Sequence, residues 1–234
     1  MSMAIINKRY RDIFEEYIYK NQQTPLTIGT LAVCAFCFLL LIIATFTETS
    51  IPTPHISYDS IYGLNFSTKI LNYTPRIPVM IFIIYLLGRN YSMLVFFTYL
   101  IVGFFVWPIF VFGGGLSYIQ NYLFGYFLGF IFAIFITGGL LSISQNFKAK
   151  LISGSLGVIS IHLCGFLYCV ILALFGVIGF NMVLPIAHII SGSNIIYDLL
   201  FSIIVLLIGP YIKNVFWVCM KPKPDKKKKL EKLK

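Results

Sequence analysis

The chain is built largely from uninterrupted apolar runs of about twenty residues, and this feature restricts its fold more than any other. An α-helix needs about 20 apolar residues to cross the hydrocarbon core of a bilayer. The 234 residues are 59% hydrophobic and only 11% charged, which leaves too few charges for the surface of a soluble domain. The sequence therefore predicts an all-α, polytopic membrane protein.

Six transmembrane helices are predicted, at residues 27–46, 77–87, 91–112, 123–143, 152–180 and 195–218. The second run is short, because eleven helical residues cover only about 16 Å of a core about 30 Å thick. We expect it either to borrow residues from Ile70 onward or to enter the membrane as an irregular, strand-like segment. A long polar connection, residues 47–74, precedes it.

Three parts of the chain differ in composition. Residues 1–26 are polar and permit an amphipathic helix on the membrane surface, and residues 27–218 form the predicted membrane domain. Residues 219–234 hold eight of the eighteen basic residues. Such a tail is typical of a cytoplasmic flank beside anionic lipid and does not indicate a nucleic-acid site.

The distribution of lysine and arginine predicts the orientation. With both termini in the cytoplasm, six spans place sixteen basic residues inside and only Lys69 and Arg76 outside, as the positive-inside rule requires. The sequence thus predicts a multi-pass plasma-membrane protein. This orientation places four features on the outer side: the start of the second run, the loop after Trp107, the connection 181–194 and Asp198. We expect loops there to close an outward-facing substrate pocket.

The stretch 107–130 contains three consecutive glycines, Gly113, Gly114 and Gly115, among polar residues without formal charge. Glycine allows the backbone to approach another backbone or a ligand closely. A non-helical segment at membrane depth persists only where it is buried in protein or lines a cavity. The stretch is therefore either a tight turn between two helices or part of a ligand site.

Asp198 and His162 lie inside predicted spans and are candidates for a functional role. Asp198 is the only acidic one, and such residues usually mark a functional site. The alternative is that Asp198 caps the N-terminus of the last helix, a role that Asn194 could also fill. His162 in the fifth run is interpreted as a neutral histidine that donates to a helix carbonyl, with a functional role as the alternative.

The motifs resemble those of the BioY family, the biotin-binding S-components of energy-coupling-factor transporters. The resemblance covers roughly residues 27–215, and its most specific part runs from the glycines to the sequence FGYFLGF. The matching residues are Pro75, Ile77, Pro78, Val79, Gly103, Pro108, Phe110, Gly113 to Gly115, Tyr118, Phe124, Gly125, Tyr126, Gly129, Phe130, Val183, Leu184, Pro185 and Asp198. The chain departs from the family at Phe201, where the family has lysine, and at Asn121 and Tyr122, which replace a basic residue and a proline.

The resemblance implies biotin as the ligand and assigns roles to residues. Asp198 would accept the ureido N–H groups, and aromatic side chains would enclose the apolar ring. The carboxylate would be held by Arg76, by Asn121 or Gln120, or by the backbone N–H groups of the three glycines. The candidate substrate-binding residues are Asp198, Asn121, Tyr118, Gln120, Arg76, Trp107, Gly113, Gly114, Gly115 and Tyr126. No catalytic residue, metal or cofactor is implied.

The resemblance also implies partners. The chain has no GxxxxGK[ST] motif, so ATP hydrolysis would come from two cytoplasmic ATPase subunits, joined through a transmembrane coupling subunit. An S-component for a different vitamin is the first alternative, because Phe201 and Asn121 depart from the family. A secondary carrier or channel lacks support from an internal repeat or a chain of intramembrane acids. An enzyme is not expected, since no Ser/His/Asp or HExxH arrangement is present.

Overall fold

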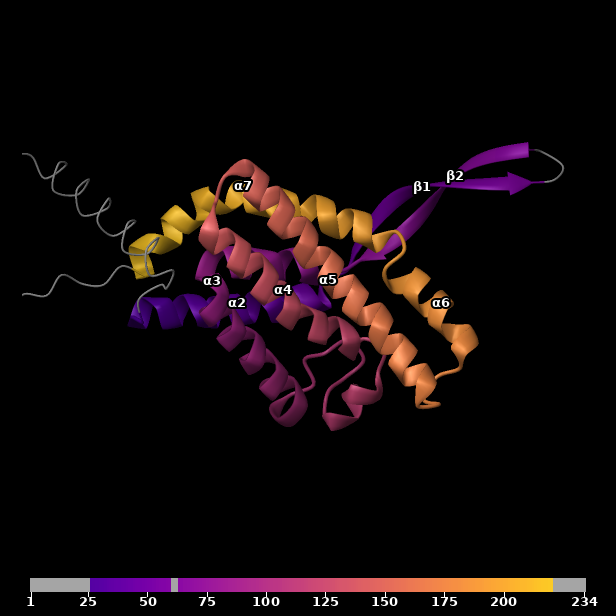
Figure 1. The fold of residues 1–234 in the computed structure, drawn as a ribbon, viewed down its shortest axis with the longest axis horizontal. Helices are drawn as coiled ribbons and strands as arrows, with labels where there is room; N and C mark the ends of the chain where they lie inside the picture. Colours follow the sequence, from indigo (N-terminus) through magenta and orange to yellow (C-terminus); the bar gives the residue numbers. More distant parts are fainter. Residues whose placement is uncertain (1–25, 60–62, 221–234) are drawn as a thin grey trace, which may run out of the picture.

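The structure is a computed structural model that describes residues 26–59 and 63–220. The predicted amphipathic segment and lysine tail lie almost entirely outside the described residues. The elements in chain order are α2 (Ile28–Phe46), β1 (Thr49–Asp59), β2 (Gly63–Tyr73), α3 (Arg76–Ile101), η1 (Val102–Val106), η2 (Leu116–Gln120), α4 (Phe124–Ile143), α5 (Phe147–Leu174), α6 (Phe180–Ile190) and α7 (Asn194–Met220). The helices pack into one bundle, from which the hairpin β1–β2 projects (Figure 1).

The described residues contain five helical segments that are long and apolar enough to cross a membrane: 28–46, 76–106, 124–143, 147–174 and 180–216. The sequence predicted six. The difference arises because the predicted second and third runs are continuous in one helical element, α3 with η1. The predicted first and fourth runs agree with α2 and α4 to within one residue at each end.

Helix α3 reverses direction at Gly88. This residue has φ 73° and ψ 179°, a backbone conformation that glycine adopts and other residues avoid. The Ser92 hydroxyl donates to the carbonyls of both Gly88, at 2.7 Å, and Ile83, at 3.1 Å. In a continuous helix Ile83 and Ser92 would be about 13 Å apart along the axis. The element therefore consists of a short arm, 76–87, and a longer arm, 89–106, that folds back beside it.

The short arm lies in the core of the bundle. All residues from Met80 to Leu87 are buried, and Met80, Ile81, Ile83 and Leu86 are 0% exposed. Such an all-round apolar helix is typical of a segment surrounded by other helices. Its shortness is tolerated because its ends meet protein rather than lipid.

The connection 47–74 is not a loop but an antiparallel β-hairpin, which corrects the all-α prediction. Thr49 pairs with Tyr73 and Asp59 with Gly63. The second strand alternates apolar residues, Leu64, Phe66 and Ile70, with polar ones, a pattern that favours a strand. The hairpin ends at the base of α3, so its last residue, Tyr73, reaches the helical core and is buried.

The connection 181–194 also differs from the prediction, because most of it is the helix α6. This helix packs against α5 and buries Val183, while most of its other residues are exposed or half-buried. Figure 1 shows α6 and the hairpin at the end of the bundle opposite the C-terminus of α7.

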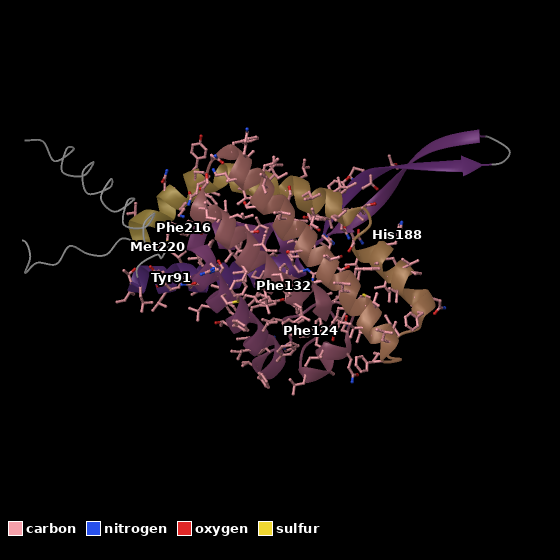
Figure 2. The ribbon with its side chains drawn as sticks, in the orientation of Figure 1. Tyr91, Phe124, Phe132, His188, Phe216 and Met220 are labelled. Atoms are coloured by element: carbon pink, nitrogen blue, oxygen red, sulfur yellow. The ribbon has the colours of Figure 1, made fainter. Side chains whose placement is uncertain are left out.

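Helices α4 and α5 approach each other closely through glycines. A Cβ on Gly129 would lie 2.6 Å from the Cα atom of Ile161, and one on Gly157 would lie 2.2 Å from the Thr137 hydroxyl. Small residues at such contacts are typical of membrane helices. The outer surface, in contrast, carries large apolar side chains on every helix, for example Phe36, Phe97, Phe132, Leu163 and Leu200, and these cover the bundle in Figure 2. A surface of this kind faces lipid.

Candidate functional site

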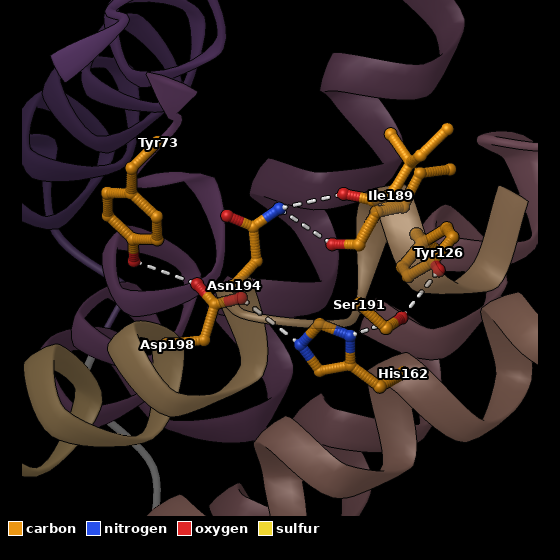
Figure 3. Close-up of polar contacts among 8 residues, drawn as sticks. Tyr73, Tyr126, His162, Ile189, Ser191, Asn194 and Asp198 are labelled. Carbon is orange, nitrogen blue, oxygen red and sulfur yellow. Dashed lines mark hydrogen bonds and ion pairs between the residues drawn. The ribbon is translucent and has the colours of Figure 1, made fainter. Parts of the chain in front are cut away.

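A chain of buried polar contacts joins five elements near the start of α7 (Figure 3). The Tyr73 hydroxyl donates to Asp198 Oδ1 at 2.8 Å, and Asp198 Oδ2 lies 3.1 Å from His162 Nε2. His162 Nδ1 lies 2.9 Å from the Ser191 hydroxyl, which lies 2.7 Å from the Tyr126 hydroxyl. The Tyr73, Asp198, His162 and Tyr126 side chains are buried.

One arrangement of protons satisfies every contact in this network. With Asp198 ionised and His162 neutral, Tyr126 donates to Ser191, Ser191 donates to His162 Nδ1, and His162 donates through Nε2 to Asp198. Tyr73 donates to the other carboxylate oxygen. Each oxygen of the carboxylate thus receives a donor, which a buried charge requires.

Each donor is held in place by packing. Tyr73 contacts the rings of Phe201 and Tyr197, with centroids 5.4 and 6.1 Å away. The Tyr126 ring fills the space left by Gly165, where a Cβ would come within 2.5 Å of it, and it meets His162 edge to face. Phe201, which stands where the resembling family has lysine, therefore supports Tyr73.

Burial raises the pKa of the Tyr73 hydroxyl, and the charge of Asp198 and the hydrogen bond to it raise the pKa further. All three causes favour the protonated phenol. Tyr73 therefore remains a hydrogen-bond donor to Asp198 throughout the physiological pH range.

A cavity of about 50 Å³ lies beside the network. This volume holds a few water molecules and is smaller than the roughly 300–1000 Å³ of pockets that enclose drug-sized ligands. Its lining combines polar and apolar residues. The lining residues are Tyr73, Thr74, Arg76, Ile77, Leu123, Tyr126, Phe127, Phe130, His162, Ile190, Asn194 and Asp198.

Three of the residues predicted from the sequence, Asp198, Arg76 and Tyr126, meet at this cavity. Asp198 is not the cap of α7, because both oxygens contact side chains of other elements. Arg76 begins α3, directly after Pro75. Among the described residues its guanidinium has no hydrogen bond or ion pair.

Tyr118 lies behind the cavity wall rather than in it. Its ring stacks on Phe127, with centroids 5.6 Å apart, and Phe127 lines the cavity. Burial raises the pKa of the Tyr118 hydroxyl, and the charge of Arg76 acts in the opposite direction. This hydroxyl is buried and has no partner within the part of the chain that the structure describes.

The other predicted residues belong to the loop between η1 and α4 and do not line the cavity. Asn121 Oδ1 accepts from the backbone N–H of Leu123 at the start of α4. Gln120 is exposed, and Trp107 is 68% exposed. Their contact with a ligand stays a prediction.

The three glycines have a role in the loop itself. Gly113 and Gly115 have φ of 120° and 85°, values that favour glycine. The Gly115 N–H donates to the Gly103 carbonyl at 3.0 Å, and a Cβ on Gly114 would lie 2.5 Å from the same oxygen. This geometry supports the interpretation of the run as a tight turn, and a contact of these amides with a ligand remains a prediction.

Sequence reasoning missed Tyr73, Ser191 and Asn194 as cavity or network residues and misjudged His162. The expected donation of His162 to a helix carbonyl is wrong, because its ring nitrogens contact Asp198 and Ser191. The signal available was its position in a spanning helix, where ionisable side chains usually have a partner. Nothing in the sequence placed it opposite Asp198, 36 residues away.

Comparisons with known proteins agree on the family and the fold. The model of the BioY family matches residues 20–217, most of the chain. The chain belongs to the BioY family. A solved structure, the S-component for biotin from an ECF-type ABC transporter, is similar at 22% identity and a TM-score of 0.59, over 81% of this chain and 95% of that chain. A comparison with curated protein sequences found no significant match.

The fold of this chain resembles the fold of that S-component. Because the chain belongs to the BioY family and has five apolar helical segments, it is a multi-pass membrane protein.

Proposed function

We propose that this BioY protein is the biotin-binding membrane subunit of a vitamin uptake transporter. The observation that carries the proposal is the buried carboxylate of Asp198 at the edge of a cavity lined by polar and apolar residues. The S-component for biotin, whose fold this chain resembles, supports the choice of ligand.

Biotin has polar and apolar parts, and the cavity lining offers partners for both. Its ureido group would donate to Asp198 through a charge-assisted hydrogen bond, in place of a donor from Tyr73 or His162. Its apolar ring would contact Phe127, Phe130 and Tyr126. Its carboxylate would bind Arg76, whose guanidinium has no anionic partner among the described residues and whose desolvation an anion would offset.

The cavity must widen before biotin enters, because about 50 Å³ is too small for it. Two contacts close the site in the structure: Tyr73 from the hairpin with Asp198, and Ser191 from the end of α6 with His162 and Tyr126. Both closing residues belong to connections rather than to the central helices. We therefore infer that the hairpin and α6 move outward to admit the ligand.

We infer six membrane crossings, because the two arms of α3 run in opposite directions from Gly88. The cations gather at the end of the bundle away from the site. Lys150 and Lys213 lie 5.4 and 5.3 Å from the Tyr85 ring centroid, and Arg89 lies at the α3 turn. Lys213 is fifteen residues after Asp198, about 22 Å along α7. By the positive-inside rule this end is cytoplasmic and the cavity opens outward.

Transport would require partners, because no ATP-binding motif is present in the sequence. A transmembrane coupling subunit and two cytoplasmic ATPase subunits would supply the driving force. The protein itself would capture biotin at the outer face and release it inward, without enzymatic activity. Co-purification of the three partner subunits with the tagged chain, from cells that produce all four, tests this assembly.

A different vitamin is the second candidate ligand. The observation that favours it is Phe201, which packs on Tyr73 where the resembling family places a basic residue. A site with one fewer cation suits a ligand with fewer acceptor groups. The alternative keeps the same cavity and the same partners.

A ligand panel on the detergent-solubilised protein separates the two candidates. Biotin, thiamine, riboflavin, niacin and pantothenate would each be titrated, with binding followed by isothermal calorimetry. We expect saturable binding of biotin alone. If another vitamin binds and biotin does not, the proposed ligand is wrong, while the similarity to the S-component fold is unaffected. Binding of none would refute the capture function.

A further inference from the structure

Asn194, one turn before Asp198 on α7, carries a buried acceptor without a partner. Its Nδ2 donates to the Ile190 carbonyl at 2.8 Å. Its Oδ1 is buried and has no hydrogen-bond partner within residues 26–59 and 63–220. Native structures leave few such atoms unpaired, so each one calls for an explanation.

The orientation of this amide follows from its neighbours. The nitrogen faces the carbonyls of Ile189 and Ile190 at the end of α6. A reversed amide would set its oxygen 2.8 Å from another carbonyl oxygen, with no hydrogen between them. The oxygen therefore lies on the side away from α6, and Figure 3 shows it there, toward Tyr73.

Asn194 and Asp198 stand side by side at the cavity, and both line it. Residues four apart share one face of a helix, with Cβ atoms about 5–6 Å apart. The cavity thus presents two adjacent acceptors, one charged and one neutral. The two N–H groups of a cyclic urea diverge from one carbonyl carbon and need two such acceptors.

We infer that Asn194 Oδ1 is the second acceptor for the ligand and binds one ureido N–H while Asp198 binds the other. This inference rests on the proposed function. It makes the two ureido nitrogens unequal, because a hydrogen bond to a carboxylate is stronger than one to an amide oxygen. It also makes Asn194 a specificity-determining residue, since a ligand with a single N–H would leave one buried acceptor unpaired.

The alternative is a purely structural role for Asn194, because its Nδ2 hydrogen bond to the Ile190 carbonyl connects α7 to α6. The test therefore compares ligands as well as proteins. Affinities for biotin and for its two derivatives methylated on one or the other ureido nitrogen would be measured by calorimetry in the parent protein and in Asn194→Leu. Leucine branches at the same carbon as asparagine but has no acceptor or donor.

We expect Asn194→Leu to weaken biotin binding by about three- to tenfold, the value of one neutral hydrogen bond. The affinity ratio of biotin to one methylated derivative should fall by the same factor, and the ratio to the other should not change. Asn146→Leu, which alters an exposed asparagine at the start of α5, should change nothing in the ratios.

Equal weakening of all three ligands in Asn194→Leu, or weakening of none, would overturn the inference and leave the proposed function standing. Parent protein that fails to bind biotin would overturn both. If Asn194→Leu does not fold, the same affinity ratios measured in Asn194→Ala answer the question. The parent protein alone also tests the inference: if it binds both methylated derivatives as tightly as biotin, the inference is wrong.

Discussion

At the scale of single residues, the proposed site depends on Asp198. Its carboxylate is buried and holds two donors, Tyr73 and His162, that come from other elements. A ligand with N–H groups can replace those donors without leaving the charge unpaired. Both oxygens of the Asp198 carboxylate therefore have partners within the protein, and the proposed ligand would have to supply donors in their place.

Arg76 is expected to recognise the carboxylate of biotin. Changing Arg76 to glutamine removes the charge, so affinity for biotin should fall by about 2–3 kcal/mol, the contribution of a hydrogen bond to a charged group, while affinity for the uncharged biotinamide should not change. Calorimetric titration of both ligands measures the difference. Equal effects on the two ligands would show that Arg76 does not contact the carboxylate and that its side chain serves the fold or a lipid phosphate.

Tyr73 is expected to link stability to alkaline pH. Its pKa in the folded protein is raised above the ordinary value of about 10 by burial and by Asp198. The stabilisation from the neutral phenol is complete below about pH 10 and is lost as the pH rises further, because only the unfolded chain then gains from ionisation.

The melting temperature of the parent protein should therefore exceed that of Tyr73→Phe by an amount that is constant from about pH 7 to 9 and shrinks toward about pH 11. A difference that grows with alkaline pH would contradict this assignment. Phenylalanine is a suitable comparison because it keeps the ring packing on Phe201.

The sequence identified only part of this chemistry. Asp198 was predictable as the only acidic residue inside an apolar run, Arg76 as the only arginine on the predicted outer side, and Tyr126 from the family motifs. His162 was visible but its partner was not, since hydrogen-bond partners in different helices leave no local pattern. Tyr73 was unpredictable because its strand has the composition of a polar connection.

At the scale of elements, the turn of α3 at Gly88 positions the site. It returns the chain through the bundle, so that the short arm starts at the cavity with Arg76 and ends near Lys213. The sequence indicated a short second span, and the structure explains how it is accommodated, in the protein core. The hairpin was missed because its strands lie in a segment with the composition of a polar connection, and the alternation in the second strand was not used.

Gly88 is expected to be required for this turn. The change Gly88→Ala forces a Cβ into φ 73° and should destabilise the protein by roughly 1–2 kcal/mol. Space is not the cause, since no atom lies within 4 Å of the added Cβ. Thermal unfolding in detergent, followed by intrinsic fluorescence, measures the effect.

Gly139→Ala is the matched control. Gly139 lies within α4 and its added Cβ also meets no atom within 4 Å, so alanine should stabilise the helix by about 0.5–1 kcal/mol. A Gly88→Ala protein as stable as the parent would mean that α3 does not need its positive φ at this position.

At the scale of the whole molecule, the two ends of the bundle differ in chemistry. One end holds the cavity and the carboxylate, and the other holds Arg89, Lys150 and Lys213. The positions of the basic residues in the sequence predicted that most cations gather at one end of the bundle. The sequence predicted six crossings, which is the number we infer when the two arms of α3 are counted separately among the five helical segments.

The topology is tested with two engineered cysteines, one at each end of the bundle. In intact cells a membrane-impermeant maleimide should label Ser50→Cys, at the start of the hairpin, and spare Gln145→Cys, between α4 and α5. Both positions are exposed in the structure, and the parent protein serves as the control for labelling of its native cysteines. The reverse pattern would invert the orientation and place the cavity on the cytoplasmic side.

The central claim is that Asp198 binds biotin in the outer cavity, and its most direct test is a biotin titration of three purified proteins. The parent should bind one biotin per chain. Asp198→Asn should bind about 2–4 kcal/mol more weakly, because a buried donor loses its charged acceptor. Glu48→Gln, which makes the same chemical change at an exposed position, should bind like the parent. Equal affinity in all three proteins, or no binding by the parent, would contradict the account.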